Sequence, residues 1–299
     1  MLESSQKLPR PSRLACRPTR RAFLAGVAST ALIRGQSALA GAALRFGLTP
    51  VFLNNDLELR DHLGAYLEKA TGRPVELVTR RTYQEITSLL ISGQLDAAWI
   101  CGYPFVKFAD QLRLVSVPLW RGRPLYQSYL VVGADRPVAD AEELRNDVHA
   151  FSDPDSNSGY LVTSALLADW NESPARFFRE SFFTYGHRNV IRAVGSGLAD
   201  SGSVDGYVWE VVRDVEPQLA EQTKVIRRSE WLGFPPIAAP VRGMTPERLA
   251  LLRQAFGDMA SDPTGREVLD LLRLDGFTEG TPSLFDPIRA KVDKIEGQG

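Results

Sequence analysis

The sequence has few of the residues that build disulfide bonds, metal sites or catalytic centres. Its 299 residues include two cysteines, Cys16 and Cys101, and three scattered histidines. No histidine-rich metal site is expected from so few ligands, and no cofactor. The G-x-S-x-G, H-E-x-x-H and P-loop motifs are all missing. Cys101 and His187 could form a thiol–imidazole pair, but no third group that would orient them is recognisable, so we do not expect an enzyme.

The sequence also lacks an apolar run long enough to span a membrane. The stretch after Arg20 and Arg21 is interrupted at Arg34, short of the roughly 20 apolar residues that a span needs. The paired arginines, the following "AFLAG" and the small residues at Ala38 and Ala40 resemble a twin-arginine export signal cleaved after Ala40. We therefore expect residues 1–40 to be removed and the mature chain to enter the periplasm without membrane insertion.

Removal of residues 1–40 would leave an acidic chain. That segment holds seven basic residues and one acidic residue, so its loss changes the formal charge from −1 to −7. An acidic protein has no favourable long-range field toward nucleic acid or an anionic membrane, and neither partner is expected. The mature chain keeps only Cys101 and can form no intramolecular disulfide. We expect a monomer that binds any anion through local groups.

From residue 43 onward, short strand-like runs alternate with amphipathic segments. The alternation predicts an α/β fold with parallel sheets covered on both faces. It further suggests two lobes joined by crossover strands, with a ligand cleft between them. The expected lobe boundaries are 41–130 with 232–299 for lobe I, and 131–231 for lobe II. Gly72 should end the first helix.

The turn "SDPDSNSGY" at 152–160 precedes the apolar run "LVTSALLADW" and is the first candidate site. If that run is a helix, Ser156, Asn157 and Ser158 lie at its N-terminus, where free N–H groups and the helix dipole favour an anion. Gly159 would let the backbone approach a ligand closely. The alternative is an ordinary surface turn in which Asp155 or Ser156 caps the helix.

Several segments together carry a family resemblance. The stretches "RFGLTP", "YQEITSLLISGQLDAAW", "SDPDSNSGY", "GHRNVIRAV" and "GLADSGSVDG" occur in the order and spacing typical of periplasmic phosphonate-, phosphite- and phosphate-binding proteins, the PhnD-like family. The chain resembles this family over most of residues 43–240. The resemblance implies a two-lobed, type II-like periplasmic binding protein that captures a small oxyanion for an ABC transporter.

The resemblance also implies roles for individual residues. Residues 156–158 are similar to the hydroxyl-rich anion clamp of the family, with Asn157 in place of its usual threonine. Tyr83 matches a tyrosine that reaches the oxyanion, and His187 matches a histidine that donates to it. Asp205 matches an acidic residue on the next strand. The alternatives are packing for Tyr83, a structural role for His187, and a turn cap for Asp205.

Two further residues follow a buried strand in "AAWICGYPFV". Cys101 lies where α/β sheets place their ligand-binding ends, and its thiol is either a small buried hydrophobe or a soft ligand for a centre such as arsenite. Arsenite-sensing periplasmic proteins of the AioX type are similar in having a cysteine in this region. Tyr103, between Gly102 and Pro104, is selected as an aromatic lining of the cleft; Tyr126 and Ser128, near the crossover, are not selected.

The departures from the family bear on the ligand and the partner. Relatives that bind aminoethylphosphonate hold its ammonium group with carboxylates in the second half of the chain. At the corresponding places this sequence has Val212 and the "GFPP" stretch, and Glu210 is expected to point to another face of its helix. The resemblance therefore implies a ligand without an ammonium group. Its partner is either an ABC transporter permease or, for a sensing protein, a histidine kinase.

Overall fold

The computed structural model describes residues 43–50 and 57–297. The expected export signal and its cleavage position lie outside these residues. In the part of the chain that is described, no helix is long and apolar enough to cross a membrane. The described residues also contain no cluster of three or more histidine, cysteine or acidic side chains that could hold a metal ion.

The strands of the described residues form a six-stranded sheet, a five-stranded sheet and a two-stranded ribbon. The six-stranded sheet has the order β13-β4-β12-β3-β1-β2. Its strands come from both ends of the described chain: β1 (Leu44–Leu48), β2 (Val75–Thr79), β3 (Ala97–Trp99), β4 (Leu112–Leu119), β12 (Ile237–Pro240) and β13 (Gly276–Thr278). The C-terminal segment therefore contributes β12 and β13 to the first sheet.

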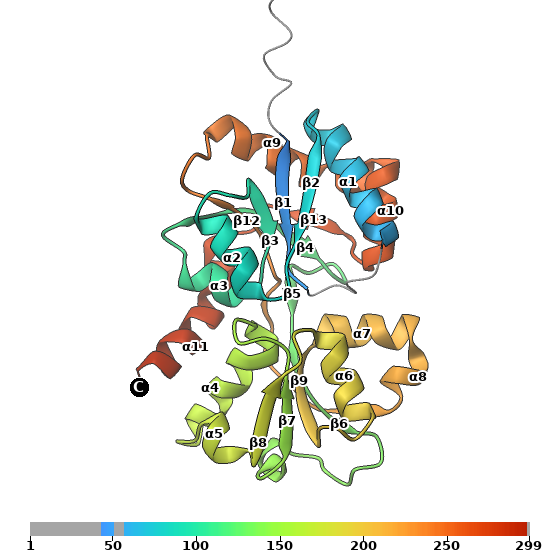
Figure 1. Cartoon of the computed structure of the whole chain (residues 1–299), viewed down its shortest axis with the longest axis vertical. Coiled ribbons are helices and arrows are strands. Elements are labelled where there is room, and N and C mark those ends of the chain that lie inside the picture. The colour runs from blue at the N-terminus through green and yellow to red at the C-terminus, as the bar shows by residue number, and fades with distance from the viewer. Residues whose placement is uncertain (1–42, 51–56, 298–299) are drawn as a thin grey trace, which may run out of the picture. The chain divides into compact units, whose positions relative to one another are not determined.

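Helices cover both sides of the six-stranded sheet. Figure 1 shows α1 and α10 on one side of β1, with α2 and α3 on the other. As predicted, α1 stops at Gly72, whose positive φ of 66° suits glycine. The helices associated with this sheet are α1 (Leu57–Thr71), α2 (Tyr83–Ile91), α3 (Gly102–Lys107), α9 (Pro246–Gly257), α10 (Pro263–Leu272) and α11 (Asp286–Glu296).

The five-stranded sheet comes from the middle of the chain and has the order β10-β6-β9-β7-β8. Its α4 and α5 lie on one side and α6 to α8 on the other (Figure 1). Its strands are β6 (Ser128–Gly133), β7 (Val148–Phe151), β8 (Glu180–Phe183), β9 (Ser201–Asp205) and β10 (Thr223–Arg228). Its helices are α4 (Val162–Asp169), α5 (Pro174–Phe177), α6 (His187–Gly195), α7 (Gly206–Val215) and α8 (Pro217–Ala220).

The expected α/β class is confirmed, but the prediction of parallel sheets is wrong. In the first sheet, β1 is parallel to β2 and β3, whereas β12 is antiparallel to β3 and β4. In the second, β6 is antiparallel to β9 and β10. The physical reason is that the chain changes sheets through the ribbon of β5 (Leu125–Tyr126) and β11 (Leu232–Gly233), so β12 enters the first sheet against its neighbours. The alternation of strands and helices along a sequence does not show where the chain passes from one sheet to the other.

The segment 126–133 is divided between two strands. Tyr126 ends β5 and Ser128 begins β6, so the two residues lie on either side of the change from the ribbon to the second sheet. Both are buried, with exposed fractions of 0% and 3%. The division matters for the site, because it places two polar side chains where the two sheets approach the turn at 152–160.

Candidate ligand-binding site

Most of the turn at 152–160 is buried, although Pro154 is exposed. Ser156 and Asn157 are 0% exposed and Ser158 is 1% exposed. The expected helix does not begin as an α-helix: residues Asn157–Leu161 form a π-helical turn that leads into α4. Such turns are rare and often lie at functional sites. The side chain of Ser156 caps this turn by accepting a hydrogen bond from the Gly159 N–H at 2.9 Å.

Gly159 is required by close packing of the turn. A Cβ atom at this position would lie 1.8 Å from Ser152 Oγ and 3.0 Å from His187 Cε1. Only a residue without a side chain fits there. The groups that Gly159 approaches in the structure are Ser152 and His187, and its close approach to a ligand stays a prediction.

The remaining groups of the turn contact residues from distant parts of the chain. The Asn157 N–H donates to Cys101 Sγ at 3.1 Å, and Asn157 Nδ2 donates to the Tyr126 hydroxyl at 2.8 Å. Ser128 Oγ donates to the Ser158 carbonyl at 2.6 Å. Tyr126 and Ser128 were missed by sequence reasoning; their position at the crossover was the available signal, but no residue pattern marked them as contacts of the turn.

Tyr83 is the first residue of α2 and is fully buried. The helix begins there because Thr82 and Glu85 form a capping box. The Tyr83 N–H donates to Asp153 Oδ2 at 3.2 Å, and its hydroxyl lies 3.2 Å from His187 Nε2. Tyr83 thus joins a helix of the first sheet to both the turn and α6 of the second.

His187 is neutral, and its tautomer follows from its partners. The Asp205 N–H donates to His187 Nδ1 at 3.1 Å. Because that N–H can only donate, the neutral ring carries its proton on Nε2 and donates it to the Tyr83 oxygen. Burial lowers the pKa of His187 to about 3, so the ring carries no charge at neutral pH. The Tyr83 hydroxyl proton is then left to point toward another acceptor.

Asp205 serves as the cap of α7, as the alternative reading of this residue held. Its Oδ1 accepts hydrogen bonds from the N–H groups of Tyr207 and Val208, at 2.8 and 3.2 Å. Burial raises the pKa of Asp205 to about 7 despite these two bonds. Burial also raises the pKa of Asp153. Asp205 and Asp153 therefore hold their protons more tightly than ordinary carboxyl groups do.

Cys101 and Tyr103 occupy different surroundings. Cys101 is the N-cap of α3 and is 2% exposed, and burial raises the pKa of its thiol to about 11. The group is a protonated thiol at neutral pH, in contact with the turn. Tyr103 is 8% exposed, with the ammonium group of Lys107 5.8 Å from its ring centre. In the part of the chain that is described, no hydrogen bond joins Tyr103 to Tyr83 or His187.

These contacts bring five helical N-termini together. The first residues of α2, α3, the π-helical turn, α6 and α7 are Tyr83, Gly102, Asn157, His187 and Gly206. Each presents backbone N–H groups and the positive end of its dipole. We call this set, with Cys101, Tyr126, Ser158 and Asp205, the N-terminal cluster. It contains no lysine or arginine.

Two polar atoms of this cluster are buried without a hydrogen-bond partner in the described part of the chain: Asn157 Oδ1 and Ser158 Oγ. Buried polar atoms of this kind normally find a partner, because desolvating them without one costs about 1–3 kcal/mol. A hydroxyl and aligned helix dipoles suit a small anion, which such dipoles can hold without a formal positive charge.

The fold and this cluster define a solute-binding protein of the periplasmic type. Residues 46–285 match the family described as the periplasmic substrate-binding protein of a phosphonate ABC transporter. The match covers most of the chain, and the protein belongs to this family. Members of the family are the substrate-binding component of a transporter rather than enzymes. The expected membership in a family of periplasmic binding proteins is confirmed.

Individual relatives agree with the family assignment. The chain is 26% identical over 234 residues to the phosphate-import protein PhnD of Mycolicibacterium smegmatis, covering 74% of this chain and 70% of the relative. The structure resembles a binding protein of a phosphonate ABC transporter from Pseudomonas aeruginosa, with a TM-score of 0.78, 21% identity and coverage of 86% and 89%. It also resembles PhnD1 of Prochlorococcus marinus, solved with methylphosphonate, with a TM-score of 0.76, 16% identity and coverage of 85% and 98%. These structural likenesses establish the periplasmic-binding-protein fold.

Proposed function

We propose that the protein captures a small phosphorus oxyanion, a phosphonate, phosphite or phosphate, and delivers it to the permease of an ABC transporter. The convergence of five helical N-termini on buried polar side chains carries the proposal. The positive ends of helix dipoles stabilise an anion at short range, and they do so in a cluster that contains no lysine or arginine.

Each side chain has a role that follows from its hydrogen bonds. Tyr83, whose oxygen accepts from His187, directs its own proton to a ligand oxygen. Ser158 supplies a second hydroxyl donor. Ser156 shapes the turn as its cap, and Asn157 is held in place by Tyr126. Asp205, when protonated, donates to the oxyanion.

The predicted lobes give this site a means of closing. We propose lobe I as 41–130 with 232–299 and lobe II as 131–231, since the two sheets draw their strands from these parts of the chain. The Tyr83–Asp153, Tyr83–His187 and Cys101–Asn157 contacts then join one lobe to the other. Closure around a ligand would form these contacts, and release would break them.

The acids near the cluster bear on which ligand fits. Glu210, the nearest candidate in sequence for an ammonium partner, accepts from the Tyr129 hydroxyl at 3.0 Å and pairs with Arg121 at 3.2 Å and Arg213 at 2.6 Å. Its carboxylate is therefore occupied. The occupied carboxylate supports an oxyanion ligand without an ammonium group. We also assign Tyr103 to the outer lining of the site.

Calorimetric titration with phosphate, phosphite, methylphosphonate and aminoethylphosphonate tests the proposal. We expect binding of one of the first three and weaker binding of aminoethylphosphonate. Ser158→Ala should weaken the tightest of these ligands about tenfold or more, because a hydrogen bond to a charged group contributes about 1.5–3 kcal/mol. Ser261→Ala, at an exposed serine, is the matched control and should bind as the wild type. Equal affinities of all three proteins would refute the role of the turn.

A sensing function is the second candidate. The structure resembles a histidine kinase sensor domain with a TM-score of 0.55 and 15% identity, covering 78% of this chain and 96% of the domain. Cys101 adds a thiol in direct contact with the turn. For this candidate, arsenite should raise the melting temperature of the wild type and not of Cys101→Ser. A phosphorus oxyanion that stabilises both forms equally favours the transport receptor.

We further propose export by the twin-arginine route, on the strength of the pattern at residues 20–40. Replacing both Arg20 and Arg21 by lysine keeps the charge and removes the arginine pair. The expected result is accumulation of the uncleaved precursor in the cytoplasm, detected by cell fractionation and mass. Unchanged delivery of a chain that begins at Gly41 would contradict the route.

A further inference from the structure

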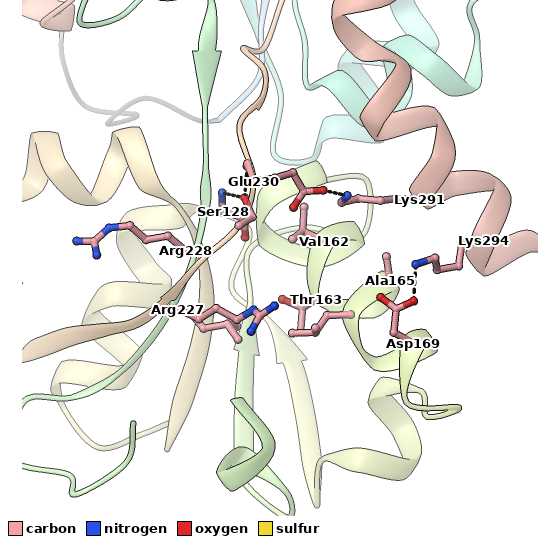
Figure 2. A pocket seen from close by; sticks show the side chains of 13 residues that line it. Ser128, Val162, Thr163, Ala165, Asp169, Arg227, Arg228, Glu230, Lys291 and Lys294 are labelled. Atoms are coloured by element: carbon pink, nitrogen blue, oxygen red, sulfur yellow. Dashed lines mark hydrogen bonds and ion pairs between the residues drawn. The ribbon is translucent and has the colours of Figure 1, made fainter. Parts of the chain in front are cut away.

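A separate pocket lies behind the turn, between the five-stranded sheet and the C-terminal helix. It has a volume of about 220 Å³ (Figure 2). Residues of β6, α4, β10 and α11 line it, together with Ser229 and Glu230, which follow β10. It contains none of Tyr83, Cys101, Asn157 or His187. A pocket of this size suits a ligand smaller than a drug-sized molecule.

Cationic side chains outnumber acidic ones in this pocket. Arg227, Arg228, Lys291 and Lys294 line it, against Asp169 and Glu230. Lys294 pairs with Asp169 at 2.5 Å, and Lys291 pairs with Glu230. The two lysines and two acids therefore balance, and the excess positive charge comes from the arginines.

The two arginines differ in what they contact. The Arg228 guanidinium lies 5.0 Å from the ring centre of Tyr129, on the other side of the strand. Figure 2 shows Arg228 pointing away from the pocket and Arg227 pointing into it, toward Thr163. Within the part of the chain that the structure describes, Arg227 forms no ion pair and no side-chain hydrogen bond, so its guanidinium remains available to a ligand.

A β-bulge aims Arg227 into the pocket. Val225 pairs with Val131, but Arg227 pairs with Leu130, so Ile226 is an extra residue in β10. Without the bulge, Arg227 would share the face of Val225; with it, Arg227 shares the face of Leu130, which lines the pocket. Bulges redirect side chains in this way, and they are frequent beside binding sites.

Part of the pocket wall is apolar. Leu130, Val162, Ala165 and Leu166 form it. A planar guanidinium binds a carboxylate through two parallel hydrogen bonds, and an apolar wall favours a short hydrocarbon chain. We propose that this pocket binds a small organic anion, with its carboxylate on Arg227 and its hydrocarbon part on this wall. The pocket is separate from the oxyanion site, and Ser128 adjoins both, since it lines the pocket and donates to the Ser158 carbonyl of the turn.

Nuclear magnetic resonance of the full chain tests the proposal, with butyrate as the probe. Butyrate should shift the backbone amide signals of residues 162–166 and 227–230. Butyramide, which has the same shape without the charge, and sulfate, which has charge without a hydrocarbon part, should shift them at least several-fold less at equal concentration. Equal shifts from either compound would overturn the proposal.

Variants locate the contact. Arg227→Gln should weaken butyrate binding about tenfold or more, since a bidentate charge-assisted pair is lost. Arg227→Lys keeps the charge but not the two parallel donors. Its affinity for butyrate should lie between those of Arg227→Gln and the wild type. Arg113→Gln, at an exposed strand arginine of the other sheet, is the control and should bind as the wild type. Wild-type binding by both Arg227 variants would refute the assignment.

Discussion

Replacing Gly159 by alanine should destabilise the folded protein, because the turn has no space for a methyl group. The added Cβ would lie 1.8 Å from Ser152 Oγ and 2.7 Å from Ser152 Cβ. Rotation about the Ser152 side chain can relieve the first contact but not the second, so the backbone of the turn must move. Overpacking of a core position costs about 1–3 kcal/mol, and this double contact places the variant near the upper end.

Urea denaturation measures the effect as a lower midpoint at an unchanged slope. For a chain of this size, a loss of about 3 kcal/mol corresponds to a melting temperature roughly 6–12 °C lower. Gly257→Ala is the matched control, since a Cβ there meets nothing within 4 Å, and it should unfold close to the wild type.

A second variant separates the contact from a general effect of the substitution. The double variant Ser152→Gly with Gly159→Ala removes the two closest atoms that the new Cβ would meet and leaves His187 Cε1 at 3.0 Å, so it should recover part of the lost stability. Ser152 Oγ has no hydrogen-bond partner among the described residues, so its removal leaves no buried donor unpaired. If Gly159→Ala unfolds at the wild-type midpoint, the close packing of the turn on Ser152 is wrong.

Three further outcomes are expected. Tyr83→Phe should lower phosphate or methylphosphonate affinity about tenfold or more and reduce stability by about 1–3 kcal/mol, because His187 Nε2–H loses its acceptor; calorimetry and urea unfolding check both. Asp205 holds its proton to about pH 7 in the folded state and to its ordinary, lower pKa in the unfolded chain; this group therefore lowers the unfolding free energy as pH rises from about 4 to 7, against the opposite contribution of the buried neutral His149 and His187, and Asp205→Asn should remove its share, so that the unfolding free energy of the variant rises more steeply over this range than that of the wild type. Lys291 is 14% exposed in its side chain and Lys294 is 40% exposed; Lys291→Ala should destabilise the protein more than Lys294→Ala, which should cost less than about 1 kcal/mol and less still at high salt.

The order and type of most elements could be predicted because local signals agree with the fold. Thr82 and Glu85 form the capping box before Tyr83, and Gly72 ends α1 through its positive φ. These features depend on residues close in sequence. Strand direction does not depend on residues close in sequence. The antiparallel position of β12 beside β3 depends on the crossover ribbon, whose paired residues Leu125 and Gly233 are more than 100 residues apart.

The same distinction holds at the site. Ser156, Asn157 and Ser158 were found because their turn has an unusual local composition, and Tyr83 and His187 through the family resemblance. Tyr126 and Ser128 could not be selected, since their contacts with the turn join residues about 30 positions apart across a break between strands. The π-helical turn was missed because no local residue pattern distinguishes it from the first turn of an α-helix.

The charge state of the site is the part that the sequence could not supply at all. A histidine near an anion suggests an imidazolium, and an aspartate suggests a carboxylate. Burial reverses both, lowering the pKa of His187 to about 3 and raising that of Asp205 to about 7. The site therefore offers an anion neutral donors and helix dipoles near neutral pH. A ligand that carries its own proton can return a hydrogen bond to Asp205 once this carboxyl ionises, whereas a fully ionised ligand meets repulsion. On the proposed role of Asp205, we expect the protein to bind a ligand that carries a proton more tightly than a fully ionised ligand of the same shape.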